Sequence, residues 1–147
     1  MRHEPVFSLR LLGGATLALM LAPLPAIAGP VTAVIENVPD DSGTIRVAIC
    51  TEDEFLKPSC RYHAETKAVA PRVSVTFADI PEGIYAVQAF QDRNANARLD
   101  RSFIGIPKEP IGFSRDPKVS FGPPGFDDCA VRLSPAGGAL SLTLITH

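Results

Sequence analysis

The chain has 147 residues, of which 14 are basic and 16 acidic, and its net charge is −2. The two signs are mixed along the chain with no basic stripe, which argues against a nucleic-acid-binding protein. This length suits a single domain with a self-sufficient hydrophobic core.

Residues 1–28 have the pattern of a secretory signal peptide. A weakly positive start with Arg2 and Arg10 precedes an apolar run from Leu11 to Leu24, and small residues flank Ile27. The apolar run is too short to span about 30 Å of hydrocarbon, so it predicts a leader cleaved after Ala28. We expect a mature domain at 29–147, without a transmembrane segment, exported to the periplasm or the extracellular space.

Alternation of apolar and polar side chains predicts half-buried strands at 44–50, 72–77 and 139–145. Residues 83–91 are apolar on both faces, which indicates a central strand that ends at Asp92. Turn-forming residues separate these segments, and further short runs lie at 31–38 and 129–133. The pattern predicts an all-β protein, a single antiparallel β-sandwich of about seven strands.

Three cysteines lie in the predicted mature domain, where export favours disulfide formation. Cys50 and Cys60 flank one short polar loop, so we predict a disulfide between them and a buried free thiol at Cys129. Thr51 and Glu54 have the spacing of a capping box, which predicts a short helical turn inside that loop.

The segment 92–100, with sequence DRNANARLD, holds the densest set of polar side chains. Calcium prefers six to eight oxygen ligands, and a calcium loop supplies them at alternate positions. The side chains of Asp92, Asn94, Asn96 and Asp100 and the carbonyl of Arg98 fit positions 1, 3, 5, 9 and 7 of such a loop.

Two departures weaken this calcium pattern. Ala97 stands at the position that normally needs Gly, and Phe103 stands where a bidentate Glu is usual. Glu109 is a candidate third carboxylate if the chain folds back. We expect weak affinity, about 10⁻⁴–10⁻³ M. The alternative is a turn in which Asx side chains bond their own backbone.

The segment 102–126 contains five prolines, four glycines and seven large apolar residues. Its apolar content predicts a long ordered loop over one end of the sandwich. Its aromatic side chains could form a binding surface, but packing into the core is the commoner use and is our expectation.

These motifs resemble a known family in their order along the chain. The segments 92–100, 103–109, 112–114 and 122–128 are similar to a bacterial family catalogued as domain of unknown function 2141. The resemblance implies an exported β-sandwich of the transthyretin-like (prealbumin) or carboxypeptidase-regulatory type, and it assigns no activity. Ala97 departs from the Gly that members usually carry.

We therefore predict an exported, non-enzymatic binding or structural module that holds at most a weakly bound calcium ion. Its partner would be a protein or a component of the cell envelope. The alternative is a small periplasmic hydrolase that uses Glu109 with Asp127 or Asp128 as paired carboxylates. Tyr85, which follows a Pro-Gly turn, is expected to be structural and not catalytic.

Overall fold

The computed structural model describes residues 28–146. The predicted signal peptide falls almost wholly on residues 1–27, which lie outside the described residues. Within 28–146 no helix is long and apolar enough to cross a membrane.

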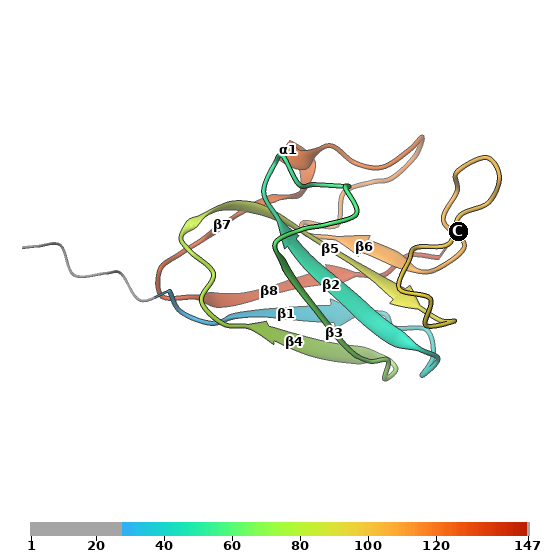
Figure 1. The fold of residues 1–147 in the computed structure, drawn as a ribbon, viewed down its shortest axis with the longest axis horizontal. Coiled ribbons are helices and arrows are strands. Elements are labelled where there is room, and N and C mark those ends of the chain that lie inside the picture. Colours follow the sequence, from blue (N-terminus) through green and yellow to red (C-terminus); the bar gives the residue numbers. More distant parts are fainter. Residues whose placement is uncertain (1–27, 147) are drawn as a thin grey trace, which may run out of the picture.

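The described chain is built from β-strands with one helix of a single turn (Figure 1). In chain order the elements are β1 (Val31–Glu36), β2 (Thr44–Cys50), β3 (Tyr62–Lys67), β4 (Arg72–Phe77), β5 (Gly83–Asp92), β6 (Ile111–Phe113), α1 (Phe126–Cys129), β7 (Ala130–Leu133) and β8 (Gly138–Thr143). The all-β prediction is confirmed, and β2 and β4 have the predicted bounds.

The strands form two sheets. One has the order β4-β1-β8, and the other has the order β3-β2-β5-β6 (Figure 1). β5 is central, as predicted: it pairs with β2 on one side, and with β7 and β6 on the other. The first half of β5 pairs with β7 and its second half pairs with β6, so the two short strands lie along the same edge of β5.

The strand count and one strand direction differ from the prediction. Residues 28–146 form eight strands instead of about seven, and β1 and β8 pair in parallel where we expected only antiparallel pairs. Alternation along a strand reports which face is buried and says nothing of the partner's direction. A parallel pair needs a long crossover, and here nearly the whole domain connects β1 to β8.

Both sheets contribute side chains to one hydrophobic cluster. Val47 and Ile49 of β2 and Ile35 of β1 are among its buried members. A second cluster contains Ala86 of β5 and Phe113 of β6. Adjacent residues of a strand point to opposite faces, so Val87 and Ala86 place the two clusters on opposite faces of the five-stranded sheet.

The predicted disulfide between Cys50 and Cys60 is confirmed, with the two Cα atoms 5.1 Å apart, and Cys129 is a buried free thiol. The loop between the bonded cysteines contains the predicted helical turn, in which Phe55 N donates to the Thr51 carbonyl at 3.0 Å, and it does not continue as an α-helix. Thr51 N donates to the Glu54 carboxylate at 3.2 Å, which is half of a capping box. Leu56 then takes a positive φ of 60°, which ends the helical path after one turn.

Tyr85 is buried near the start of β5, and its hydroxyl donates a hydrogen bond to the Pro81 carbonyl at 3.1 Å. Burial raises the pKa of this phenol. Tyr85 thus closes the turn before β5.

Candidate functional site

The acidic loop, residues 92–100, begins where β5 ends. Asp92 is completely buried there. Its carboxylate accepts hydrogen bonds from Asn96 N at 3.0 Å, from Ala97 N at 2.8 Å and from the Arg46 guanidinium at 2.9 Å. This single side chain therefore ties the loop backbone to itself and to the neighbouring strand β2.

The other three oxygen-bearing side chains of the acidic loop meet one another. The amide groups of Asn94 and Asn96 donate to the two carboxylate oxygens of Asp100, at 2.6 Å and 3.0 Å. The Asn94 and Asn96 side-chain oxygens accept hydrogen bonds from the main chain of Asn96 at 3.2 Å and of Arg98 at 2.8 Å. These are side-chain-to-backbone contacts of the kind that hold Asx turns.

Glu109 folds back onto the same loop. Its side chain is buried, with 5% exposure, and its two oxygens accept hydrogen bonds from Arg93 N at 2.9 Å and Asp100 N at 3.0 Å. Lys108 N also donates to the Asp100 carbonyl at 2.8 Å. Glu109 thus fastens both ends of the acidic loop, from a position that sequence spacing alone does not reveal.

Electrostatics keep Asp92 ionised. Burial by itself would raise the pKa of Asp92, but hydrogen bonds from Ala97, Arg46 and Asn96 outweigh it and lower the pKa below its ordinary value of 3.8. Arg46 also pairs with Glu65 at 2.7 Å. A cation in the loop would have to compete with Arg46 for the Asp92 carboxylate.

The acidic loop therefore offers many oxygen atoms, but its carboxylates are already held by hydrogen bonds or by an ion pair. In the part of the chain that the structure describes, no three Asp, Glu, His or Cys side chains converge as a metal site. Ala97 takes the left-handed conformation, φ 65°, that we expect at the position where Gly is usual. The left-handed backbone of Ala97 costs about 1 kcal/mol relative to Gly.

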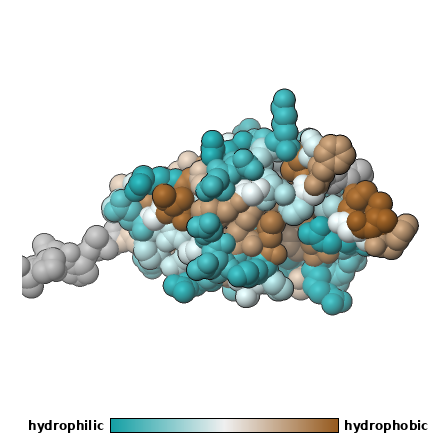
Figure 2. Space-filling view, turned by 90° about the horizontal axis from the view of Figure 1, so that it is seen from above, coloured by the Kyte–Doolittle hydropathy of each residue, from teal (hydrophilic) through white to brown (hydrophobic). Residues whose placement is uncertain are grey.

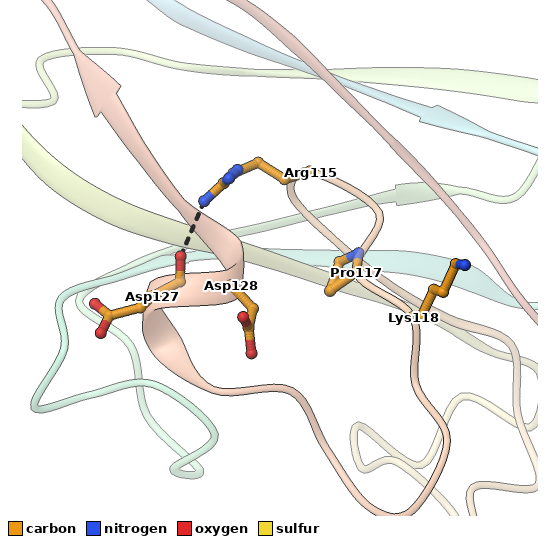
Figure 3. A pocket seen from close by; sticks show the side chains of 5 residues that line it. All are labelled: Arg115, Pro117, Lys118, Asp127 and Asp128. Carbon is orange, nitrogen blue, oxygen red and sulfur yellow. Dashed lines mark hydrogen bonds between the residues drawn. The ribbon is translucent and has the colours of Figure 1, made fainter.

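Asp127 and Asp128 lie on α1 beside a polar cavity of about 470 Å³ (Figure 3). Arg115 reaches across to the Asp127 carbonyl at 2.9 Å, and the two carboxylates point in different directions. Asp128 accepts a hydrogen bond from Gly125 N at 3.2 Å, which caps the helix. Glu109 is not among the residues that line this cavity, so the three carboxylates of the hydrolase hypothesis do not surround it.

A larger, apolar groove of about 600 Å³ lies over the second hydrophobic cluster. Its floor includes Phe90 of β5 and Phe113 of β6. Three segments form its walls: residues 56–58 of the disulfide loop, residues within 97–107, and residues within 119–123. We call this feature the apolar groove.

Large hydrophobic side chains around the apolar groove are exposed to solvent. Phe103 and Phe121 are fully exposed, at 101% and 104%, and Ile104 is 65% exposed. Figure 2 shows hydrophobic side chains gathered toward the right-hand end of that view. Leu56 and Ile106, which line the groove, are also exposed.

The expectation of core packing for the aromatics of segment 102–126 is confirmed for Phe113 and Phe126 and is wrong for Phe103 and Phe121. Pro124 and the residues in and beside β6 are the buried part of this segment, because β6 pairs with β5 as a strand of the same sheet and places Ile111 and Phe113 in the second hydrophobic cluster. The chain on either side of β6 projects as loops (Figure 1). Phe103 and Phe121 lie on these loops and are fully exposed, so they do not reach the core. The sequence signal for the groove was the cluster of apolar residues in the proline-rich segment 102–126. The opposite wall, at Leu56, lies more than forty-five residues before most of that segment.

Comparison with known proteins gives one family. A family model described as an uncharacterized protein conserved in bacteria (DUF2141) matches residues 33–139. No curated protein and no solved structure matches the chain.

Proposed function

Since this chain belongs to the uncharacterised bacterial family DUF2141, we propose a function from its geometry. It is an exported, non-enzymatic module that binds a small apolar ligand in the apolar groove. Its two sheets form a β-sandwich of the transthyretin-like type, and its acidic loop is a weak calcium site at the edge of the groove.

The observation that carries this proposal is the groove itself. Its volume of about 600 Å³ lies within the range of roughly 300–1,000 Å³ that is usual for small-molecule sites. Contiguous exposed apolar surface is uncommon on monomeric proteins away from binding sites. The exposure of Leu56, Ile104 and Ile106, which line the groove, therefore supports a binding role.

The calcium part of the proposal rests on the oxygen atoms of Asp92, Asn94, Asn96 and Asp100 and on the carbonyl of Arg98, with Glu109 adjacent. Competition from Arg46 favours an affinity in the millimolar range, about 10⁻³ M. Ala97, Arg98 and Leu99 of this loop also line the groove. A bound cation would therefore stiffen one wall of the ligand site.

The hydrolase alternative has weaker support. Asp127 and Asp128 line a cavity with Arg115, but both oxygens of Glu109 already accept main-chain hydrogen bonds elsewhere. A general acid or base needs a carboxyl group within reach of the substrate.

The groove is tested with N-phenyl-1-naphthylamine, an uncharged dye that fluoresces in apolar surroundings. We expect the mature chain to bind it and Ile104→Asp to weaken binding by roughly tenfold, because a charge is placed against an apolar ligand. The matched control is Ile84→Asp: Ile84 is also about half exposed, at 53%, but does not line the groove. An equal loss of dye affinity in both variants, or no dye binding by the wild type, would contradict the proposal.

A further inference from the structure

We propose that the apolar groove accepts a single-chain amphiphile with an anionic head group, such as a fatty carboxylate. This inference rests on the proposed function of the groove and names the class of its ligand. The acyl chain lies on the apolar floor, and the head group meets cationic side chains at the walls.

The charged side chains that line the groove indicate an anionic head group. Lys57, Arg98 and Arg101 line the groove, and no Asp or Glu of residues 28–146 does. The described chain as a whole carries more acidic than basic residues, so a lining with cations alone is not what average composition would produce. Two separate walls contribute these cations, because Lys57 belongs to the disulfide loop and the two arginines follow β5.

These three cations are also without acidic partners. Among residues 28–146, five other arginines each form an ion pair with a carboxylate: Arg46, Arg61, Arg72, Arg93 and Arg132. Arg115 and the other described lysines, Lys67, Lys108 and Lys118, form none, so it is the position of the three unpaired cations at one groove that distinguishes them. Lys57, Arg98 and Arg101 form none within the described residues, although Arg101 donates to the Gly105 carbonyl at 3.0 Å. An anionic ligand would supply the carboxylate or phosphate that the protein does not.

The uncharged side chains that line the groove indicate that the rest of the ligand is an acyl chain. Leu56, Ile104 and Ile106 at the walls and Phe90, Ile111 and Phe113 at the floor are hydrophobic. The only uncharged polar side chains that line the groove within the described residues are Gln88 and Ser120. A sugar or a nucleotide needs many directional hydrogen bonds, which this lining does not offer, whereas an acyl chain needs contact area.

The head group is tested by titrating the mature chain with decanoate, 1-decanol and decylammonium below their aggregation concentrations, with displacement of N-phenyl-1-naphthylamine as the readout. We expect decanoate to bind roughly tenfold more tightly than decanol, and decylammonium to bind least. Octanoate should bind roughly tenfold more weakly than decanoate, because two methylene groups are lost from the groove.

Variants locate the charge effect. The double variant Lys57→Gln/Arg98→Gln should lose roughly tenfold in decanoate affinity and keep its affinity for decanol. The matched control is Lys67→Gln/Arg132→Gln, which removes the same charges away from the groove and should leave both affinities unchanged. Thermal melting of each variant establishes that it is folded.

Each of the other outcomes contradicts one part of the proposal. Equal affinity for decanoate and decanol, or equal loss in both double variants, would overturn the anionic head group and leave the groove intact. Failure of every amphiphile to displace the bound dye would overturn the amphiphile class, while failure of the dye itself to bind contradicts the proposed function. Sedimentation with vesicles of phosphatidylglycerol and phosphatidylcholine without decanoate binding would assign the surface to a membrane and overturn the single-chain ligand.

Discussion

Asp92 connects three parts of the molecule through one carboxylate. It ends β5, accepts two main-chain hydrogen bonds from the acidic loop, and pairs with Arg46 of β2. A charge without water around it is costly unless it is paired and hydrogen-bonded, and Asp92 satisfies both conditions. The conformation of the acidic loop therefore depends on this residue remaining ionised.

The pKa of Asp92 predicts a pH dependence. Because the folded-state pKa lies below 3.8, the stabilisation by Asp92 is present above that value and is lost as the pH falls through the folded pKa. Asp92→Asn should lower the free energy of unfolding by about 1–3 kcal/mol at pH 7. The difference from the wild type should shrink below pH 3.8.

Urea unfolding of both proteins from pH 7 to pH 2 measures this difference. The pKa values of Asp40 and Glu54 are also lowered, each first by a main-chain hydrogen bond, from Ser42 and Thr51 respectively. Both groups are present in the variant too, so their contributions cancel in the comparison. A difference that is constant across the whole pH range would show that the charge of Asp92 is not what stabilises the loop.

Ala97 predicts the response of the acidic loop to calcium. If the dissociation constant is near 1 mM, calcium at about 10 mM stabilises the folded state by about 1.4 kcal/mol and raises the melting temperature by a few degrees. Magnesium should have a smaller effect, because it needs tighter octahedral geometry. Ala97→Gly should enlarge the calcium response, since Gly adopts positive φ without strain.

Differential scanning fluorimetry in calcium and in chelator measures these shifts. Ala78→Gly is the matched control, because Ala78 is exposed and has no positive φ. Identical wild-type melting curves in calcium and in chelator would leave the loop as a turn held by its Asx side chains alone.

At the scale of elements, the groove depends on loops that β-strands hold in place. The disulfide loop leaves β2, the acidic loop leaves β5, and the segment 114–125 connects β6 to α1. Lining residues come from all three segments. Rigid attachment matters, because a preformed site loses less conformational entropy when it binds.

The disulfide between Cys50 and Cys60 is predicted to stabilise both the fold and one wall of the groove. In the chain-entropy model, closing a loop of ten residues contributes about 2–3 kcal/mol to the free energy of unfolding. Cys50→Ser/Cys60→Ser should lose about this amount. It should also bind N-phenyl-1-naphthylamine more weakly, because Leu56 and Lys57 are no longer held at the groove.

Non-reducing peptide mapping should recover a linked peptide that contains Cys50 and Cys60. Cys129 should stay unmodified by iodoacetamide at pH 8 in the folded protein, because burial raises the pKa of its thiol to about 11. A linked peptide that contains Cys129 would refute the assignment. Unchanged dye binding by the double variant would show that the groove does not depend on the disulfide.

At the scale of the whole molecule, the five-stranded sheet has apolar side chains on both faces. The three-stranded sheet contributes to the cluster on one face. The other face carries side chains of β5 and β6, and among the described residues the disulfide loop and the Phe126 end of α1 pack on it. These pieces pack edge to face through Phe55 against Phe113 and Phe126, with ring centres 6.0 Å and 5.9 Å apart. The apolar groove is the part of this face that they leave open.

The sequence by itself determined which segments are strands wherever the apolar pattern extends over several residues. The alternation in β2 and β4 and the apolar character of β5 were sufficient, because side-chain period and burial are local properties of a strand. The disulfide was also predictable, since its two cysteines are ten residues apart around one loop. β3 and β6 were missed, because β3 is a largely polar edge strand and β6 has only three residues.

Only the tertiary structure decided which segments meet at the apolar groove and at the acidic loop. Three features join residues that are distant in the chain. They are the parallel β1–β8 pair, the hydrogen bonds of Glu109 to the acidic loop, and the groove that Leu56, Ile104 and Pro123 line together. A periodic pattern records the environment of each side chain separately, whereas a groove is the space left between segments after they pack. Phe103 and Phe121 follow the same rule: their hydrophobicity is evident in the sequence, but their exposure depends on the loops that carry them away from the core.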